Sequence, residues 1–493
     1  RRVSGFTRFG EDNATNPNST NPILGLAVYA DGVIACSGDG IFFSQDGISW
    51  MQLNKASVAN SGDNYSTFNA RSNNARTGQG QCHFDIYEGT SDYGEILIVD
   101  GANKPFYFKM TGTGALDTRT FYAEKITVSG TISPTVGTIH DKHYVVAGDN
   151  DNKNVIYYSG VNDITNFSAG TAGNIALEDA VIGLKSFRNG LFIFCKNSIH
   201  KLVSINDASN IAIVPVKDND GCLDGHSIQE IGGDLIFLAP DGLRTVAGTA
   251  RIDDVEIGSI SRKILPLINN LLTNIQQFTI SSMVIRERSQ YRLFYHKSGQ
   301  GQSGQLGIIG TFKFDSNGVP AFEWSEAKGM DLKFCASELN PQNQEVKFGA
   351  NENGYIYEID KGNNFDGANI SAKFQTPDMD YGDNGLRKSL YAVKANIKPE
   401  GTQPDLKMRI RYDFESTDVP QPGSVNVGSL AATSNFGNAV YGTATYGAVT
   451  LPSKRMIVTG SGFSNNFRFF SNDTNAAYAV NGLFVSFIAG GRR

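Results

Sequence analysis

Short runs of β-prone residues separated by tight turns recur along the first three quarters of the chain. Each run holds four to seven residues, and most turns within a pair contain Gly beside Asp or Asn, which favours hairpins. The paired runs are 26–29 with 33–36, 96–99 with 106–108, 144–147 with 155–158, 182–187 with 191–195, 235–238 with 243–246, 290–296 with 307–314, and 345–349 with 355–359. Roughly seven units of two to four strands therefore follow one another at intervals of about 30–50 residues.

Small antiparallel sheets repeated at that interval predict an all-β fold, a β-propeller that protects its strand edges by radial closure. The units are not similar in sequence, so the period is one of structure only. A β-sandwich, or a pair of sandwiches, is the competing fold. Sandwich strands usually come at a more even spacing of about 8–12 residues, and this difference favours the propeller.

Residues 44–50, which read SQDGISW, resemble the Asp box of propeller blades. The usual pattern places one residue between Asp and Gly, whereas Asp46 and Gly47 are adjacent here. We expect a structural role, in which the Asp46 carboxylate accepts backbone N–H bonds across the turn and Trp50 packs between blades. The segment supports a propeller and indicates no catalysis.

Changes of texture divide the chain into three parts. The first part, 1–24, is rich in Asn, Pro, Ser and Thr and predicts an extended N-terminal arm. Residues 25–362 form the predicted propeller, and 363–493 predict a C-terminal β domain with longer alternating strands at 368–376, 390–397 and 406–413. A Gly/Ser/Asn-rich loop at 420–448 is either mobile or an ordered arm on a neighbouring subunit.

One segment, 261–276, predicts a short amphipathic helix. Its apolar residues repeat at helical spacing on one face: Ile264, Leu267, Ile268, Leu271, Leu272 and Ile275. Ser261 is a candidate N-cap, and Pro266 is expected to separate or kink the first turn. The helix would cover the open edge of a sheet or, alternatively, contact another subunit.

Charge and cysteine content exclude several classes of protein. The formal net charge is −6, and no basic block is longer than the terminal Arg pairs, so tight DNA binding is disfavoured. The five cysteines, Cys36, Cys82, Cys195, Cys222 and Cys335, are widely spaced without a CxxC pair and predict buried reduced thiols. We see no signal peptide and no run of 18 apolar residues, and expect no membrane span.

The candidate ligand motifs favour plain structural readings. Residues 299–304 match GxGxxG, but an apolar β-like run follows where a dinucleotide site needs a helix, so we expect a hairpin loop. Residues 149–154 lack the downstream Gly and Glu of a calcium-binding EF-hand, and we interpret them, like 218–221, as polar turns. His140 and His143, if both lay on one strand, would point to opposite faces and could not share a metal.

No catalytic constellation emerges from the sequence. HExxH, the P-loop and GxSxG are absent, and the carboxylates are scattered in turns. A sialidase-like site would need converging arginines, for which Arg71, Arg76, Arg188, Arg244 and Arg286 are the candidates. Nothing ties these arginines together, and we interpret them as surface or interface charges. The sequence therefore predicts no catalytic, cofactor-binding or metal-ligating residues, no cofactor and no enzyme.

Six segments, in order, give the chain a family resemblance. They are 5–9 (GFTRF), 155–168 (VIYYSGVNDITNFS), 177–202 (LEDAVIGLKSFRNGLFIFCKNSIHKL), 221–246 (GCLDGHSIQEIGGDLIFLAPDGLRTV), 257–271 (IGSISRKILPLINNL) and 482–493 (GLFVSFIAGGRR). In these segments the chain resembles the tail nozzle proteins of short-tailed phages, also described as tail tubular protein B or packaged-DNA stabilisation protein. The resemblance covers most of the chain and is densest between 150 and 275.

The resemblance implies a structural virion protein of the viral tail, assembled in the host cytoplasm. It implies a homo-hexameric ring that docks on the adaptor (head-to-tail connector) protein and offers attachment surfaces for tail fibres or spikes. Such a ring retains packaged double-stranded DNA and conducts it during genome ejection, without sequence-specific binding and without a small-molecule substrate. The chain is short beside the largest family members, which puts an elaborate distal tip in doubt.

Two other functions stay open at this stage. The first is a carbohydrate-binding or glycan-cleaving propeller, such as a tailspike or a sialidase-like protein, which would need carboxylates, arginines and aromatic residues converging at the propeller mouth. The second is a scaffold propeller of cellular origin.

Overall fold

A computed structural model gives the fold as two compact units. The described residues are 2–19, 21–55, 62–72, 74–78, 80–88, 92–130, 132–168, 170–207, 209–246, 260–314, 320–340, 342–399, 405–427 and 453–492. One unit comprises Arg8–Glu358, and the other comprises Arg1–Thr7 together with Ile359–Arg493. Among the helices of the described residues, none is long and apolar enough to cross a membrane.

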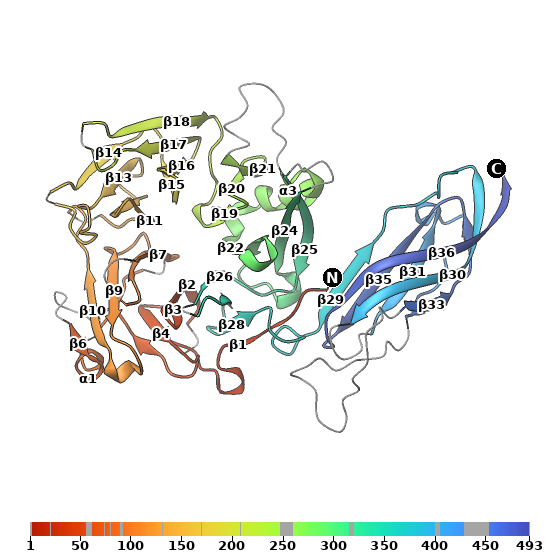
Figure 1. Ribbon diagram of the computed structural model, residues 1–493, viewed down its shortest axis with the longest axis horizontal. Coiled ribbons are helices and arrows are strands. Elements are labelled where there is room, and N and C mark those ends of the chain that lie inside the picture. Colours follow the sequence, from red (N-terminus) through yellow and green to blue (C-terminus); the bar gives the residue numbers. More distant parts are fainter. Residues whose placement is uncertain are drawn as a thin grey trace. The chain divides into compact units, whose positions relative to one another are not determined.

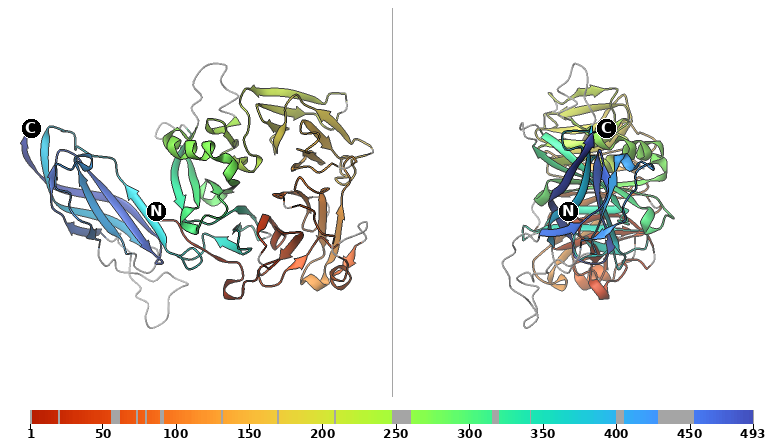
Figure 2. Two further views of the ribbon diagram at one scale, coloured as in Figure 1. Left: turned by 180° about the vertical axis from the view of Figure 1, so that it is seen from behind. Right: turned by 90° about the vertical axis from the view of Figure 1, so that its right-hand side faces the viewer.

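The larger unit is a β-propeller of small antiparallel sheets, as the sequence predicted. Within the described residues seven sheets succeed one another in chain order around a central axis, each with its first strand innermost (Figures 1 and 2). Blade 1 consists of β2 (Ile23–Tyr29), β3 (Gly32–Ser37), β4 (Gly40–Ser44) and β5 (Met51–Gln52). Blade 2 consists of β7 (His83–Tyr87), β8 (Glu95–Val99), β9 (Phe106–Thr111) and β10 (Thr120–Lys125), and β6 (Asp63–Asn64) is added beside β10. Blade 3 consists of β11 (Val136–His140), β12 (His143–Ala147), β13 (Val155–Tyr158) and β14 (Gly173–Ala176).

The remaining blades follow the same plan with local variations. Blade 4 consists of β15 (Val181–Phe187), β16 (Gly190–Cys195), β17 (Ser198–Val203) and β18 (Ala212–Asp218), and blade 5 of β19 (Gln229–Ile231), β20 (Asp234–Ala239) and β21 (Gly242–Thr245). Blade 6 consists of β22 (Thr279–Ile285), β23 (Gln290–His296), β24 (Leu306–Phe314) and β25 (Pro320–Lys328). Blade 7 consists of β26 (Phe334–Leu339), β27 (Glu345–Ala350), β28 (Ile356–Ile359) and β1 (Phe6–Arg8). Blade 7 therefore takes its fourth strand from the N-terminal segment of the chain.

This N-terminal strand closes the ring of blades. The Phe9 amide donates to the Ile356 carbonyl at 2.8 Å, and the Arg8 guanidinium lies 4.0 Å from the centroid of the Tyr355 ring. Phe9 also packs edge-on against Phe348 of β27. The first and last parts of the propeller sequence thus meet in one sheet, which leaves fewer strand edges exposed.

The apolar core of the propeller lies between successive blades. Separate clusters of buried side chains join blades 1 and 2, 2 and 3, 3 and 4, 4 and 5, 5 and 6, and 7 and 1. In blade 4, for example, Leu191 and Ile193 face blade 3, whereas Phe192 and Phe194 face blade 5. Strand alternation therefore gives each sheet two apolar faces, and each fully buried side chain of this size contributes about 1.5–3 kcal/mol.

The predicted helix at 261–276 is present, but its start differs from the prediction. A 3₁₀ turn, η4 (Arg262–Ile264), precedes α3 (Leu265–Thr273), and η5 (Ile275–Gln277) follows it. Ser261 does not cap the helix, because its hydroxyl accepts a 3.0 Å bond from the Leu243 amide instead. Ile268 and Leu271 pack into the cluster shared by blades 5 and 6, so α3 covers the side of a three-stranded sheet.

The described residues contain another short helix that the sequence did not predict. It is α1 (Tyr65–Asn69), and the Asn64 side chain caps it by accepting from the Thr67 amide at 3.0 Å. Short 3₁₀ turns complete the described helical elements: η1 (Glu11–Asn13), η2 (Leu116–Thr118), η3 (Gly225–Ser227), η6 (Arg286–Arg288), η7 (Gln302–Gly304) and η8 (Asp413–Glu415).

The C-terminal unit consists of two antiparallel sheets over one core. The first sheet has the order β29 (Ile370–Gln375), β35 (Asn465–Asp473), β31 (Lys407–Tyr412) and β32 (Val425–Asn426). In the second sheet, β30 (Leu386–Pro399) is the central strand. It pairs along one edge with β33 (Ser453–Ile457) and β34 (Ser461–Gly462), and along its opposite edge with β36 (Tyr478–Arg492). Val393, Met408 and Phe467 share the core between the sheets. In the Gly/Ser/Asn-rich stretch 420–448, residues 428–448 lie outside the described residues.

The first residues of the chain are anchored in this unit. The Arg2 amide donates to the Tyr478 carbonyl at 2.9 Å, and its buried guanidinium pairs with Asp473. The Gly5 amide donates to the Gly362 carbonyl at 2.9 Å. These residues of the predicted 1–24 arm therefore have fixed partners.

Candidate functional site

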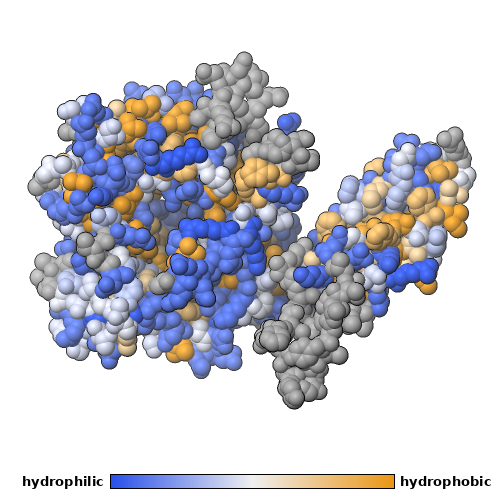
Figure 3. Space-filling model, in the orientation of Figure 1, coloured by the Kyte–Doolittle hydropathy of each residue, from blue (hydrophilic) through white to orange (hydrophobic). Residues whose placement is uncertain are grey.

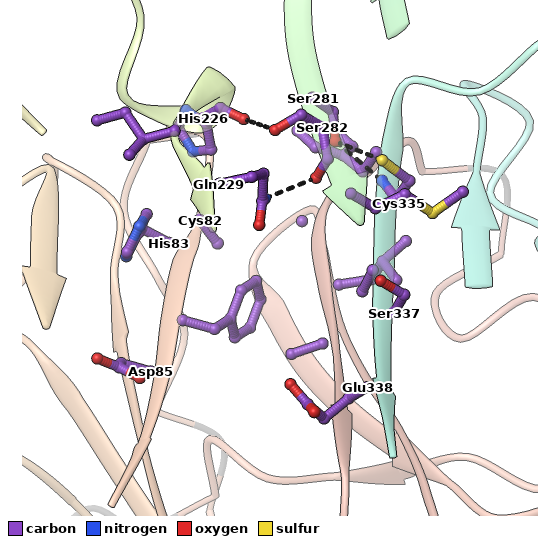
Figure 4. A pocket seen from close by; sticks show the side chains of 18 of the residues that line it. Cys82, His83, Asp85, His226, Gln229, Ser281, Ser282, Cys335, Ser337 and Glu338 are labelled. Carbon is purple, nitrogen blue, oxygen red and sulfur yellow. Dashed lines mark hydrogen bonds between the residues drawn. The ribbon is translucent and has the colours of Figure 1, made fainter. Parts of the chain in front are cut away.

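A cavity of about 440 Å³ lies on the axis of the propeller and is the candidate functional site. All seven blades line it, because the first strand of each blade faces the axis, and blade 5 also contributes the segment before β19 (Figure 4). We call it the axial cavity. Its position follows from the topology, since seven inner strands must surround whatever space the closed ring leaves.

Asp85 of β7 joins blade 2 to blade 3 in the wall of the axial cavity. Its Oδ2 accepts from Thr138 Oγ1 at 2.8 Å and from the Ile139 amide at 2.6 Å, and its Oδ1 accepts from the Ile86 amide at 2.9 Å. Burial raises the pKa of the Asp85 carboxyl above its ordinary value, although nearby Lys185 and these hydrogen bonds act in the opposite direction. The carboxylate is thus held by donors of its own chain.

Two histidines meet edge-to-face in the same wall. The ring centroids of His83 and His226 are 5.8 Å apart, and Figure 4 shows them on the same side of the cavity. Burial lowers the pKa of His83 to about 3, helped by His226 and Lys185. His83 is therefore a neutral imidazole at pH 7, and its Nδ1 has no hydrogen-bond partner.

Hydrogen bonds also link blades 5, 6 and 7 around the axial cavity. Ser282 Oγ donates to the His226 carbonyl at 2.5 Å, and Gln229 Nε2 donates to the Ser282 carbonyl at 3.0 Å. The Cys335 amide donates to Ser281 Oγ at 3.0 Å. Burial raises the pKa of the Cys335 thiol to about 12, so it is protonated at neutral pH and a poor nucleophile.

These contacts connect the blades to one another in the wall of the axial cavity. Its serine, threonine, glutamine and aspartate groups bridge neighbouring blades, and burial raises the pKa of both of its thiols, Cys82 and Cys335. Among the described residues, no group of three or more His, Cys, Asp or Glu side chains could hold a metal ion. The arrangement joins neighbouring blades around the axial cavity.

The Asp-box segment lies at the rim of blade 1 and has the predicted role. Asp46 Oδ1 accepts from the Ile48 amide at 2.8 Å and from the Ser49 amide at 2.9 Å. Burial raises the pKa of Asp46, but these amide bonds outweigh that effect and hold the pKa below its ordinary value. Trp50 packs against the cluster between blades 1 and 7, so the prediction of packing between blades is confirmed.

The five candidate arginines do not converge. None lines the axial cavity, and each pairs locally, with Asp63 (Arg71), Asp100 (Arg76), the Gly233 carbonyl (Arg188), Asp220 and Asp241 (Arg244) and Glu338 (Arg286). The prediction of a surface or interface charge is wrong for Arg76, which is 6 % exposed. Its guanidinium lies 2.9 Å from the Asp100 carboxylate, and this pairing makes burial of the charge tolerable.

The assumption that His140 and His143 share a strand is also wrong. They are directly opposite each other across the β11–β12 hairpin, because Asp141 and Lys142 form its turn with positive φ angles. Each ring has its own partner: His140 Nδ1 contacts Ser186 Oγ at 2.9 Å, and His143 Nε2 contacts Asn206 Oδ1 at 2.9 Å.

Residues 299–304 and 149–154 lie in turns, as predicted, whereas Asp218, the first residue of 218–221, ends β18. Residues 299–304 connect the paired strands β23 and β24. In the 149–154 segment, Asp149 accepts from the Ser133 amide at 2.9 Å and from the Asp151 amide at 3.2 Å. Cys36, Cys82, Cys195 and Cys222 are buried, Cys335 is half-buried, and none of the five forms a disulfide.

Sequence reasoning named Cys82 and Cys335 as buried thiols, but it did not bring them or the other polar residues of the axial cavity together in one site. Asp85, Ser281 and Cys335 share one signal, since each lies in the first strand of a blade. A polar residue in the leading strand of a repeated hairpin unit therefore points to the propeller axis. Applying that signal requires the blade boundaries, which sequence patterns locate only approximately.

Comparisons with known proteins give no family for this chain. No family model matches, and no curated protein matches. Similar solved structures include Hsv2p of Kluyveromyces lactis (11% identity, TM-score 0.30, 62% of this chain and 99% of that chain) and the N-terminal domain of Nup159 (9% identity, TM-score 0.30, 73% and 96%). An exo-β-1,3-galactanase of Phanerochaete chrysosporium with galactose is similar at 9% identity and TM-score 0.27, covering 98% of this chain and 99% of that chain. These similarities carry no argument about activity.

Proposed function

We propose that this chain is a non-enzymatic structural protein of a phage virion, a subunit of the homo-hexameric tail nozzle ring of a short-tailed phage. The ring retains packaged DNA, conducts it during ejection, docks on the adaptor protein and offers attachment surfaces for tail fibres or spikes. It is assembled in the host cytoplasm and resides in the virion tail.

The order of the resembling segments along the fold carries the proposal. Segment 155–168 begins with β13, 177–202 spans β15, β16 and most of β17, and 221–246 spans η3 and β19 to β21. The described part of segment 257–271 contains η4 and most of α3, and residues 482–492 of the last segment belong to β36. The likeness therefore falls on strands of blades 3 to 5, on the start of α3 and on β36.

The chemistry of the axial cavity supports a structural role over a catalytic one. Its polar groups join blade 2 to blade 3 through Asp85, blade 5 to blade 6 through Gln229 and blade 6 to blade 7 through Ser281. A rigid ring of blades suits a subunit that must transmit force and keep its shape while DNA passes. The net charge of −6 suits a conduit, because few phosphate contacts would hold the DNA back.

Electron microscopy and native mass spectrometry of the full-length protein with its adaptor test the proposal. We expect sixfold rings with a central channel in negative stain, and a hexamer as the main species. A monomer at high protein concentration, with the adaptor present, would refute the nozzle function.

A glycan-binding or glycan-cleaving propeller is the second candidate, and one observation favours it. Three carboxylates, those of Asp85, Glu88 and Glu338, line the axial cavity. A glycosidase needs two carboxylates roughly 5–9.5 Å apart. Release of reducing sugar from host-surface polysaccharide, lost in the variants Asp85→Asn and Glu338→Gln, would favour this function over the nozzle.

A further inference from the structure

The outer face of the β30 sheet in the C-terminal unit exposes large apolar side chains. Tyr391 is 47%, Ile457 77%, Phe484 60% and Ile488 64% exposed. Figure 3 shows apolar residues gathered on this unit where Figure 1 labels β30 and β36. Isolated exposed apolar residues are ordinary, whereas several on one sheet face mark a binding surface.

Cross-strand register places two cations on the same face. Lys394 of β30 is directly opposite Phe484 of β36 on one side and Arg455 of β33 on the other. Opposed residues of antiparallel strands share a face, so Arg455, Lys394 and Phe484 form one row. Ile457, two residues beyond Arg455, lies on that face as well. We call Tyr391, Lys394, Arg455, Ile457, Phe484 and Ile488 the β30 face.

The two units of the chain carry opposite net charges. The propeller unit holds 27 Lys and Arg against 38 Asp and Glu, a net charge of −11. The other unit holds 16 Lys and Arg against 11 Asp and Glu, a net charge of +5. A basic, apolar β30 face therefore complements an acidic propeller, and like charges would oppose contact between two β30 faces.

We propose that the β30 face of one copy binds the acidic propeller of the next copy. This inference rests on the proposed ring, because a ring needs a heterologous contact between two different, complementary surfaces of each subunit. A twofold contact between β30 faces would bring Lys394 and Arg455 of both copies together, which disfavours that arrangement. Apolar contacts supply most of the affinity, and the opposite charges set the orientation of the pair.

Isotope-coded cross-linking of the full-length protein tests this contact directly. Unlabelled and ¹⁵N-labelled chains are mixed, assembled and treated with a carbodiimide, which joins Lys to Asp or Glu without a spacer. We expect mixed-label peptides that link Lys394 to a carboxylate within residues 8–358 of the other copy. Mixed-label links confined to the C-terminal units, or rings without such links, would overturn the inference.

Paired variants give a second readout. Ile457→Ser with Phe484→Ser should weaken self-association at least about tenfold by analytical ultracentrifugation. The matched control is Phe374→Ser, a 55% exposed residue on β29 in the other sheet, which should associate like the wild type. Raising the salt concentration from 50 to 500 mM should weaken wild-type association, because it screens the opposite charges.

The outcomes separate this inference from the nozzle function. Rings that persist in the Ile457→Ser, Phe484→Ser variant would overturn the β30 contact and leave the nozzle intact. A wild-type protein that stays monomeric with its adaptor would overturn both. Equal circular dichroism spectra and melting temperatures for the variants would show that lost association does not come from unfolding.

Discussion

Thr138 Oγ1 donates a 2.8 Å hydrogen bond to Asp85 Oδ2, and this bond ties the first strand of blade 3 to the first strand of blade 2. The same carboxylate oxygen accepts from the Ile139 amide at 2.6 Å. One side chain therefore satisfies two donors of a neighbouring blade beside the axial cavity. Inter-blade bonds of this kind hold the inner strands of neighbouring blades in register.

Two replacements of Asp85 should separate the contribution of these hydrogen bonds to the free energy of unfolding from the effect of the buried charge. Asp85→Ala leaves the Ile139 amide and the Thr138 hydroxyl without their acceptor, and we expect a loss of about 1–3 kcal/mol in the free energy of unfolding. Asp85→Asn keeps one acceptor and should lose less. Urea unfolding gives both values, with Asp117→Ala, an exposed position in η2, as the control near zero.

The pH dependence of the Asp85 pair follows from the sign of its shift. Burial raises the pKa of Asp85 in the folded state, so the folded state binds the proton more tightly than the unfolded chain. The wild type should therefore lose stability relative to Asp85→Asn as the pH rises from about 4 through the folded-state pKa. A constant difference between the two unfolding curves across that range would contradict the raised pKa.

His83 should make the protein less stable in acid. Burial lowers its pKa from 6.5 to about 3, so between these values the unfolded chain binds a proton that the folded state does not. The contribution of His83 is complete above pH 6.5 and should fall by up to about 1.4 kcal/mol per pH unit below it. Urea unfolding of wild type and His83→Gln between pH 4 and 8 measures the effect; parallel curves would contradict it.

The buried Arg76–Asp100 pair should behave as one unit. Arg76 Nε donates to Asp100 Oδ2 at 2.9 Å and its Nη atoms donate to the Gly38 and Gly80 carbonyls, each at 3.2 Å. Arg76→Met leaves the buried carboxylate uncompensated, and we expect a loss of about 3–5 kcal/mol in stability. The double variant Arg76→Met, Asp100→Asn should lose less than the sum of the single variants in a double-mutant cycle; additive losses would mean that the pair is not coupled.

The fold could be predicted further than the site. Paired runs around Asp or Asn turns marked the hairpins because turn chemistry is local. The role of Asp46 was predicted correctly because the amides that donate to its carboxylate lie within three residues of it. Ser261 was misassigned because its hydroxyl bonds Leu243, a partner 18 residues away that no local pattern reveals. Arg76 was misassigned for the same reason, because its partner Asp100 is 24 residues away in the sequence.

The polar residues of the axial cavity escaped prediction because ring closure alone brings them together. Asp85 and Thr138 are 53 residues apart, and Ser281 and Cys335 are 54 apart. Each residue by itself resembles an ordinary polar position on a strand. Their shared environment depends on which strand of each blade is innermost, and that choice is made by packing of whole sheets.

Gly47 should be irreplaceable in the Asp-box turn, because the N-terminal segment lies against it. Its φ is +70°, and a Cβ atom at this position would lie 2.2 Å from the Phe9 carbonyl oxygen.

Gly130 is the matched control, with φ of +57° and no atom within 4 Å of the corresponding Cβ position. Gly130→Ala should lose about 1–2 kcal/mol from the left-handed backbone alone. Gly47→Ala should lose at least about 2 kcal/mol more, since it must also displace Phe9, whose amide bonds Ile356 and closes the ring. Urea unfolding followed by tryptophan fluorescence, with Trp50 beside the turn, measures both variants, and equal losses would mean that the N-terminal segment does not depend on this turn.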